Sequence, residues 1–208
     1  MALVIGLTGS IATGKSTIAK LFKKEGIPLV DADLISRQIV EPGREAYQKI
    51  ITVFGQDILA RDQSIDRKKL AELIFSDQEK RDQLNRILHP IIIEQIIQER
   101  DRLINQDEQL IILDIPLLFE LQLDDLVDRT IVVYTSPIQQ LQRLKNRDNL
   151  TEEQAKKRIA SQISIDQKAK KANFVLDNSD EIDKTEAQFY LLLDQLKKLI
   201  NKDDLTAK

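Results

Sequence analysis

Short apolar runs alternate with longer stretches of helical pattern along the chain. Five of these runs are continuous rather than alternating, which is typical of strands buried on both faces of a parallel sheet. Helical segments separate the runs, and this order favours βαβ units. We therefore expect an α/β fold in which helices flank a parallel five-stranded sheet. The predicted strands are Leu3–Leu7, Pro28–Val30, Leu110–Leu113, Thr130–Tyr134 and Phe174–Leu176.

The connection between the second and third predicted strands is long enough to form a subdomain. It spans residues 31–109, and its apolar positions recur at helical spacing, as in Leu70, Leu73 and Ile74. We expect an inserted helical subdomain, which in a nucleotide-using enzyme is a natural place to hold a second substrate. Within it, Pro90 predicts a helix boundary or a kink beside the single histidine, His89. At such a corner His89 is either structural or faces the substrate.

A glycine-rich loop follows the first predicted strand. Residues 9–16 read Gly-Ser-Ile-Ala-Thr-Gly-Lys-Ser, a complete GxxxxGK[ST] phosphate-binding motif between a strand and a helix. Lys15 can reach the outer phosphates of a nucleoside triphosphate, and the Ser16 hydroxyl suits a Mg²⁺ ion that bridges them. The motif predicts a sheet of the P-loop NTPase type that binds a nucleoside triphosphate. The expected nucleotide-binding residues are Gly9, Ser10, Ile11, Ala12, Thr13, Gly14, Lys15, Ser16 and Thr17.

Carboxylates stand at the ends of the second and third predicted strands. Asp31 and Asp33 follow the second strand and Asp114 follows the third, at the sheet edge where ligands gather in parallel folds. If the second strand continues, Asp31 and Asp33 point the same way; if a helix starts at Asp33, one of them is an N-cap. Asp33 is our candidate for taking a proton from an attacking hydroxyl and for binding Mg²⁺. Asp114 occupies a position like that of a Walker B acid and is a further candidate for the metal shell.

A basic helical hairpin is predicted after the fourth strand. Ser136 and Pro137 start one helix as N-cap and first residue, and Thr151 with Gln154 forms a capping box that starts another. Residues 143–171 contain nine Lys or Arg and four acids, in a chain whose net charge is −3. A solvated helix face explains most of the lysines equally well. The arginines favour a lid that closes over the triphosphate.

Composition narrows the classes of function. The net charge of −3 gives no sign of a nucleic-acid binder, and the absence of cysteine excludes disulfides and thiolate metal sites. No basic region precedes the first apolar run, which is too short to span a bilayer, so we expect no signal peptide or membrane anchor. A cytoplasmic enzyme, monomeric by default, is the expectation.

A GTPase would use the same glycine-rich loop, but its other motifs do not support it. No glycine follows an aspartate by three residues, so DxxG is missing. The stretch Asn201–Asp204 fits NKxD, yet it lies in the charged tail after the last predicted helix, with no strand ahead of it. We interpret the match as accidental.

Together these motifs resemble the dephospho-coenzyme A kinase family, over nearly the whole chain. Each motif is weak alone, but their order is specific. They are Gly6–Gly9 before the phosphate loop, Asp31–Asp33 with Arg37 and Glu41–Gly43, Leu88–Pro90, Pro116–Glu120, Gln140 through Arg143 to Asp148, Ser161–Gln162 and Asp177–Asn178.

The resemblance implies ATP-dependent phosphorylation of the 3′-hydroxyl on the ribose of dephospho-coenzyme A, giving coenzyme A and ADP. By the resemblance, Asp33 would be the catalytic carboxylate, Lys15 would stabilise the phosphoryl group, and Arg147 on the lid would contact ATP. Asn178 would lie near the adenine, and Arg37 and His89 would border the site for dephospho-coenzyme A.

The resemblance also implies a division of one kinase domain into three parts. The core would comprise about residues 1–33, 108–143 and 172–200. The helical substrate-binding insertion would comprise about 34–107, and the helical lid about 144–171.

Two other functions stay open at this point. A nucleoside or nucleoside-monophosphate kinase would also pair a phosphate loop with an insertion and a lid. A nucleotide-gated regulatory protein would bind the triphosphate without needing a catalytic base.

Overall fold

The computed structural model describes residues 2–75 and 77–206, which fall into two compact units. The first unit comprises the chain up to Asp31 and from Arg100 onward, and the second is Ala32–Glu99. The elements in chain order are β1 (Leu3–Gly9), α1 (Lys15–Lys24), β2 (Leu29–Asp31), α2 (Ala32–Gln38), α3 (Glu45–Phe54), η1 (Gln56–Ile58), α4 (Arg67–Phe75), α5 (Gln78–Ile104), β3 (Leu110–Asp114), η2 (Asp124–Leu126), β4 (Arg129–Tyr134), α6 (Pro137–Asp148), α7 (Glu152–Ala160), α8 (Ile165–Lys171), β5 (Phe174–Asp177) and α9 (Ile182–Thr206).

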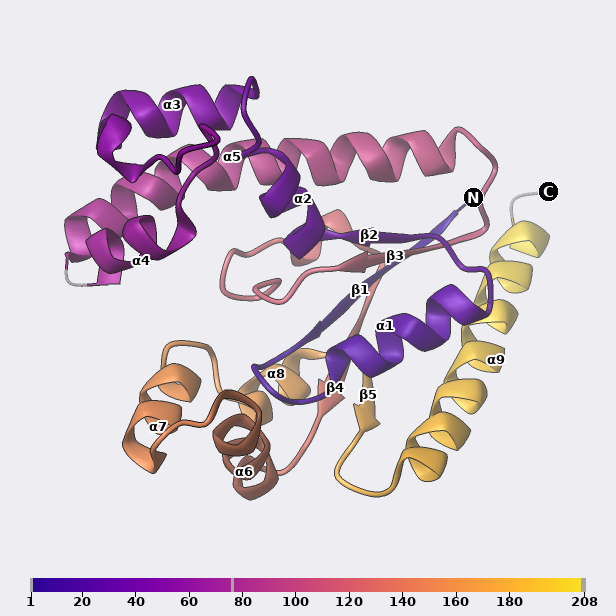
Figure 1. The fold of residues 1–208 in the computed structure, drawn as a ribbon. Coiled ribbons are helices and arrows are strands. Elements are labelled where there is room, and N and C mark those ends of the chain that lie inside the picture. Colours follow the sequence, from indigo (N-terminus) through magenta and orange to yellow (C-terminus); the bar gives the residue numbers. More distant parts are fainter. Residues whose placement is uncertain (1, 76, 207–208) are drawn as a thin grey trace. The chain divides into compact units, whose positions relative to one another are not determined.

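The first unit is built on a parallel sheet of five strands in the order β2-β3-β1-β4-β5 (Figure 1). The predicted α/β fold is therefore confirmed. Four strands run one or two residues past their predicted ends, because the backbone ladder continues after the apolar run stops. The added terminal residues are Gly9, Asp31, Asp114 and Asp177. Since β1 pairs with both β3 and β4, Gly9 reaches the carboxyl edge between these two strands.

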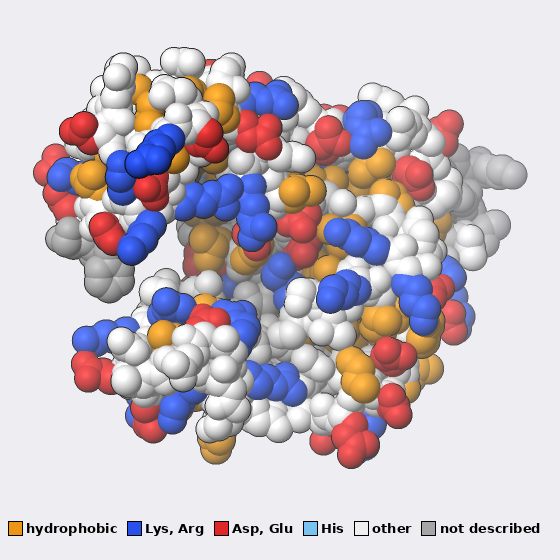
Figure 2. Space-filling view, viewed as in Figure 1, with side chains coloured by type: hydrophobic (Ala, Val, Ile, Leu, Met, Phe, Trp, Pro, Cys, Tyr) orange, Lys and Arg blue, Asp and Glu red, His pale blue; other side chains and the backbone are white. Residues whose placement is uncertain are grey.

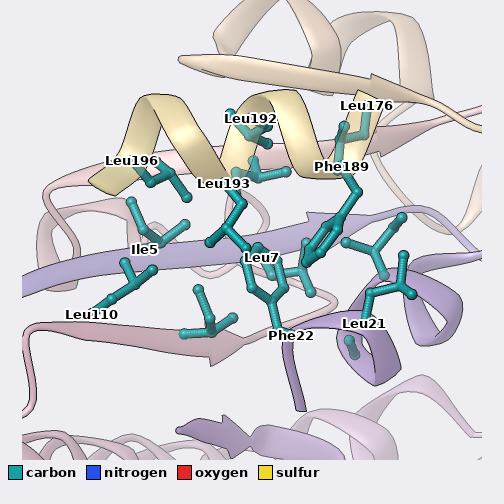
Figure 3. Packing of buried hydrophobic residues seen from close by; sticks show 14 of the residues in the cluster. Ile5, Leu7, Leu21, Phe22, Leu110, Leu176, Phe189, Leu192, Leu193 and Leu196 are labelled. Carbon is teal, nitrogen blue, oxygen red and sulfur yellow. The ribbon is translucent and has the colours of Figure 1, made fainter. Parts of the chain in front are cut away.

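Alternate residues of the central strands face two different layers of helices. Ile131 and Val133 of β4 belong to a buried cluster with residues of α1 and α9. Figure 3 shows Phe22 and Phe189 of that cluster, and Figure 1 shows the two helices. Val132 of β4 packs instead with Phe119 and with Ile165 of α8. This period of two is what a pleated strand imposes, and it explains why the strands read as continuous apolar runs.

The second unit has its own small core. Ile50 of α3, Ile58 of η1 and Leu84 of α5 are buried together, with partly buried residues of α4 packed against them. These elements confirm that the segment between β2 and β3 is helical.

The two longest helices correct two expectations. Of the two alternatives predicted at Pro90, the helix boundary is wrong, because the 27-residue helix α5 continues through this position. Proline removes one hydrogen bond, and the buried Leu84 and Ile96 anchor the turns on either side. Helix α9 extends to Thr206, so Asn201–Asp204 lies within a helix rather than in a tail beyond it. In the described part of the chain, no helix is long and apolar enough to cross a membrane.

Both predicted caps of the basic hairpin are confirmed. The Ser136 hydroxyl accepts a hydrogen bond from the Gln139 N–H, with Pro137 as the first residue of α6. Thr151 and Gln154 form the reciprocal capping box of α7.

The edge-to-face pair between α1 and α9 yields a prediction about stability. The rings of Phe22 and Phe189 are fully buried, with centroids 4.8 Å apart. Phe189→Ala should lower the free energy of unfolding by about 3–5 kcal/mol, because it leaves a cavity between helix and sheet. Leu191→Ala, at a position of the same helix that is 66% exposed, should change it by less than about 0.5 kcal/mol. Equal losses in urea unfolding would contradict this packing.

Candidate active site

The loop between β1 and α1 is a tight turn that leaves backbone donors available. Ala12 and Gly14 have φ values of 63° and 91°, and a Cβ at Gly9 would lie 2.6 Å from the Thr13 hydroxyl oxygen. Within the described residues, the N–H groups of Gly14, Lys15 and Ser16 have no hydrogen-bond partner. They are the first donors of helix α1, where backbone geometry and the helix dipole favour an anion.

The carbonyl oxygens of the same loop are held by side chains from distant parts of the chain. A carbonyl that accepts such a bond fixes the orientation of its peptide group, and so helps to fix the neighbouring N–H groups. The bonds run from Lys168 Nζ to Gly9 O (3.0 Å), from Gln140 Nε2 to Ile11 O (2.8 Å) and from Asn178 Nδ2 to Thr13 O (2.9 Å).

Asn178 is engaged at both ends of its side-chain amide. Its nitrogen donates to Thr13 O, and its oxygen accepts from the Thr185 hydroxyl at 3.1 Å. The nitrogen also lies 2.0 Å from where a Cβ of Gly14 would stand, so the Asn178 amide occupies the space that glycine leaves. The structure thus places Asn178 against the phosphate loop, as a brace.

Lys15 forms an ion pair with Asp114, the last residue of β3. Asp114 is buried and stands in register with Leu7 of β1 and Asp31 of β2. The sequence pattern indicated Asp114 only through its place at a strand end; the structure adds the contact with the phosphate-loop lysine. A phosphate that binds Lys15 either shares the ammonium group with this carboxylate or replaces it.

Arg147 lies at the end of α6, where it is paired. Its guanidinium donates to both carboxylate oxygens of Asp148, at 2.8 and 3.1 Å, and Arg158 of α7 donates to the same carboxylate at 2.7 Å. These bonds hold the pKa of Asp148 below its usual range, with Arg147 as the main cause. Over α6 and α7, basic and acidic side chains lie beside one another on the surface (Figure 2).

Asp33 and Arg37 lie in the second unit, on helix α2. Strand β2 ends at Asp31 and α2 begins at Ala32, so the alternative in which the chain turns helical near Asp33 is the correct one. Both side chains are exposed and line a pocket of about 380 Å³ in this unit. The pocket also contains Ser36, Arg67 and an apolar wall of Val40, Ile50, Ile65, Leu70 and Leu88.

The residues that line this pocket differ at two points from those that the sequence indicated. Leu88 lines the pocket, whereas the half-buried His89 is absent from the described residues that form its wall. Arg67 was missed by sequence reasoning. No local motif marks it, because it comes from the start of α4 and reaches the pocket only through the packing of the unit.

Lys168 is the other residue that the sequence did not distinguish. It was one of the lysines for which a solvated helix face was an equal explanation, yet its side chain is fully buried. The apolar neighbours Ile165 and Ala169 give a weak signal of a buried face, but nothing local identifies the partners of the charge.

Comparison with known proteins gives one consistent result. A family model described as Dephospho-CoA kinase matches residues 3–184. A dephospho-CoA kinase from Listeria monocytogenes is 49% identical over 95% of this chain and 99% of that protein, and one from Oceanobacillus iheyensis is 48% identical over 90% and 94%. Among solved structures, a dephospho-CoA kinase from Campylobacter jejuni is 31% identical with a TM-score of 0.74, covering 95% of this chain and 98% of that one.

The bracing contacts of Asn178 lead to a prediction that separates bracing from recognition of the base. Asn178→Ala leaves two buried partners unsatisfied, so the free energy of unfolding should fall by about 1–3 kcal/mol. Binding of ATP and of GTP should weaken by the same factor, because the loop that holds the phosphates is loosened. Calorimetric titration with both nucleotides measures this, with the exposed Asn105→Ala as control. A change confined to ATP would instead assign Asn178 to the adenine.

Proposed function

The chain belongs to the dephospho-CoA kinase family, and from this premise we propose which of its residues carry out the reaction. The enzyme phosphorylates dephospho-CoA at the expense of ATP, in the biosynthesis of coenzyme A. The acceptor is the 3′-hydroxyl of the ribose, and the products are coenzyme A and ADP. We infer an in-line transfer in which positioning and charge neutralisation supply most of the catalysis.

ATP binds to the phosphate loop in this proposal. The N–H groups of Gly14, Lys15 and Ser16 have no hydrogen-bond partner among the described residues. This supports their role as hydrogen-bond donors to the phosphates. The Lys15 ammonium leaves Asp114 to contact the transferred phosphoryl group, where it neutralises developing charge. The residues from Gly9 to Thr17 form the nucleotide site.

We propose Asp33 as the catalytic carboxylate, and its position in the pocket wall is the main support for this role. Its exposed side chain lines the 380 Å³ pocket together with two arginines, in the unit that contains the helical insertion. A pocket of that size suits a small-molecule group, and a carboxylate at its wall can accept the proton of an incoming hydroxyl. Asp33 also follows the last residue of β2 by only two positions in the chain.

The same pocket supports the assignment of residues that hold dephospho-CoA. Arg37 and Arg67 present guanidinium groups, which bind phosphate oxygens in a bidentate manner, and dephospho-CoA carries a pyrophosphate. The apolar wall that includes Ile50 and Leu70 can cover a non-polar part of the substrate. His89, next to the lining residue Leu88, stays a candidate at the border of the site.

The residues present fit a Mg²⁺ ion bound with the nucleotide. No group of three or more His, Cys, Asp or Glu side chains in the described chain could hold a metal alone, and Mg²⁺ in kinases is held by one or two carboxylates, waters and phosphates. The Ser16 hydroxyl would hold it, with Asp114 of the same unit as a further ligand through water, and Asp33 stays a candidate ligand on the strength of the sequence alone. When bound, the ion would neutralise charge on the phosphates.

Arg147 is the lid residue of the proposal. Its partner Asp148 is half-buried on the surface, and Arg158, which also pairs with Asp148, is exposed, so exchange of Asp148 for a triphosphate requires no disruption of the core. The lid arginine would then shield the phosphates from water.

Replacement of Asp33 by asparagine tests the catalytic assignment. The change keeps the shape and removes the charge, so kcat should fall at least about a hundredfold, as expected for loss of a general base. The KM for ATP should change little. A coupled ADP-release assay measures both, and mass spectrometry of the product confirms addition of one phosphate to dephospho-CoA.

Asp57→Asn is the matched control, because Asp57 is an exposed acid of the same unit and is absent from the pocket wall. It should leave kcat unchanged. If the Asp33→Asn enzyme turns over at the rate of the control, Asp33 is not the catalytic carboxylate.

Replacement of Arg147 by alanine tests the lid. The KM for ATP should rise several-fold to about tenfold, as for loss of one charge-assisted contact, while the KM for dephospho-CoA stays near that of the wild type. Arg158→Ala is the control, since it removes the other guanidinium from Asp148. If both variants raise the KM for ATP equally, the effect comes from Asp148 and the lid role of Arg147 is wrong.

The cytoplasmic location and the monomeric state expected from the sequence remain proposals. Sedimentation of the purified enzyme at assay concentration tests the monomer.

A further inference from the structure

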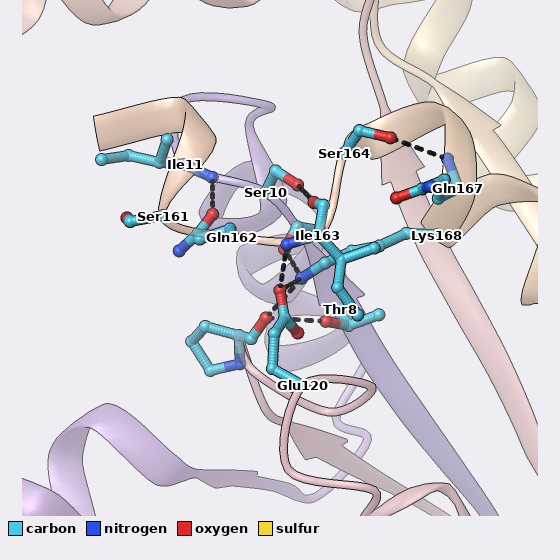
Figure 4. Close-up of polar contacts among 12 residues, drawn as sticks. Thr8, Ser10, Ile11, Glu120, Ser161, Gln162, Ile163, Ser164, Gln167 and Lys168 are labelled. Carbon is cyan, nitrogen blue, oxygen red and sulfur yellow. Dashed lines mark hydrogen bonds and ion pairs between the residues drawn. The ribbon is translucent and has the colours of Figure 1, made fainter. Parts of the chain in front are cut away.

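A buried ammonium group lies directly beneath the phosphate loop. Lys168 of α8 is fully buried, and its Nζ atom donates to three acceptors: Gly9 O at 3.0 Å, Pro116 O at 2.9 Å and Glu120 Oε1 at 2.8 Å (Figure 4). An ammonium group has three N–H donors, so every donor of this buried charge is used. Two of the acceptors belong to the segment after β3, and the third is the first residue of the phosphate loop.

The partner of Lys168 extends this contact to the loop between α7 and α8. Glu120 Oε1 also accepts from the Ile163 N–H at 3.0 Å. Ile163 in turn accepts from the Ser10 hydroxyl at 3.2 Å, and its neighbour Gln162 accepts from the Ile11 N–H at 2.8 Å (Figure 4). This loop within the predicted lid is therefore bonded to two residues of the phosphate loop, and the Lys168–Glu120 pair contacts both loops.

The Lys168–Glu120 ion pair is expected to contribute little to the free energy of unfolding. Burial lowers the pKa of Lys168, and the bond to Glu120 opposes that shift; the positive charge of Lys15 lowers the pKa further. Desolvating two charges offsets most of their attraction, and apolar residues of similar volume usually stabilise such a site equally well. Within the described chain, the second carboxylate oxygen of Glu120 is buried without a hydrogen-bond partner, and such an oxygen lowers the stability that the pair contributes.

We propose that Lys168 is a positioning residue for ATP: it fixes the Gly9 carbonyl and, through Glu120, the loop at residues 161–164, so that the phosphate loop and the base of the lid share one geometry. Lys168 touches neither nucleotide nor acceptor and acts only through the loop. This inference rests on the proposed ATP site in that loop.

The test uses a pair of variants that separate positioning from stability. Lys168→Met removes the ammonium group and leaves the Glu120 charge buried alone. The double variant with Glu120→Gln also removes that charge, while the amide oxygen of glutamine can still accept from the Ile163 N–H. Lys170→Met, at an exposed lysine of the same helix, is the matched control. For each protein we would measure the melting temperature, the Kd of ATP without the second substrate, and the KM of both substrates.

The expected result is a split between stability and ATP affinity. The double variant should melt above Lys168→Met, because no charge is left buried alone, and below the wild type, because the Gly9 carbonyl loses its donor. It should bind ATP at least about tenfold more weakly than the wild type, since mispositioning of about 1 Å can reduce function by up to about a hundredfold. Its KM for dephospho-CoA should stay within about twofold of the wild type. Lys170→Met should match the wild type throughout.

Three results would overturn the proposal. In the first, the double variant binds ATP as the wild type does. In the second, both substrates weaken by the same factor. In the third, the double variant melts as low as Lys168→Met or fails to fold, which assigns the pair to stability. Because ATP binding is measured directly, a wild-type enzyme that fails to bind ATP would reveal an error in the proposed site rather than in the role of Lys168.

Discussion

The orientation of the peptide groups in the phosphate loop is the constraint on which the site depends. A loop that offers N–H groups to phosphate oxygens must place its carbonyl oxygens elsewhere, and a buried carbonyl without a donor is destabilising. In this chain the Gly9, Ile11 and Thr13 carbonyls are each satisfied by a side chain that is more than a hundred residues away. The donors come from three helical or loop segments after β4. The anion site therefore exists only when the C-terminal half of the first unit is folded.

Part of this arrangement could be predicted from the sequence because its signals are local. The strand, loop and helix around the GxxxxGK[ST] motif, the strands predicted from continuous apolar runs, and the caps at Ser136 and Thr151 each depend on residues within a few positions of one another. All of these structural elements are confirmed. The contacts of Lys168, Gln140 and Asn178 are not local. Near Lys168, only the apolar Ile165 and Ala169 give a weak signal that separates it from the exposed Lys170, and the packing of α8 on the sheet decides which acceptors surround its charge.

Long-range packing also explains where predictions from the local sequence were wrong or incomplete. Proline in a sequence indicates a helix boundary because it removes a hydrogen bond, but buried residues on both sides of Pro90 keep α5 continuous. Asp31 and Asp33 could have shared a strand, and their spacing alone did not exclude it. The short β2 ends at Asp31, and the helix that follows takes Asp33 into the wall of a pocket built by packing within the second unit. Arg67 enters that wall from a distant helix, which no spacing rule could reveal.

The cations around the proposed nucleotide site differ in how readily they can exchange partners, and burial sets the difference. Arg147 and Asp148 are on the surface, where water screens their attraction and can solvate either group when they separate. Lys15 is mostly buried and paired with a buried carboxylate, so separating the pair costs more than at the surface, and an incoming anion can offset that cost. Lys168 is fully buried with every donor used, and to break its contacts would leave the Glu120 charge buried without its counter-charge and the Gly9 carbonyl without this donor. The exposed Arg147 is thus suited to a lid that opens and closes. Lys15, of intermediate burial, is suited to a change of anionic partner, and the buried Lys168 to fixing the conformation of the loop.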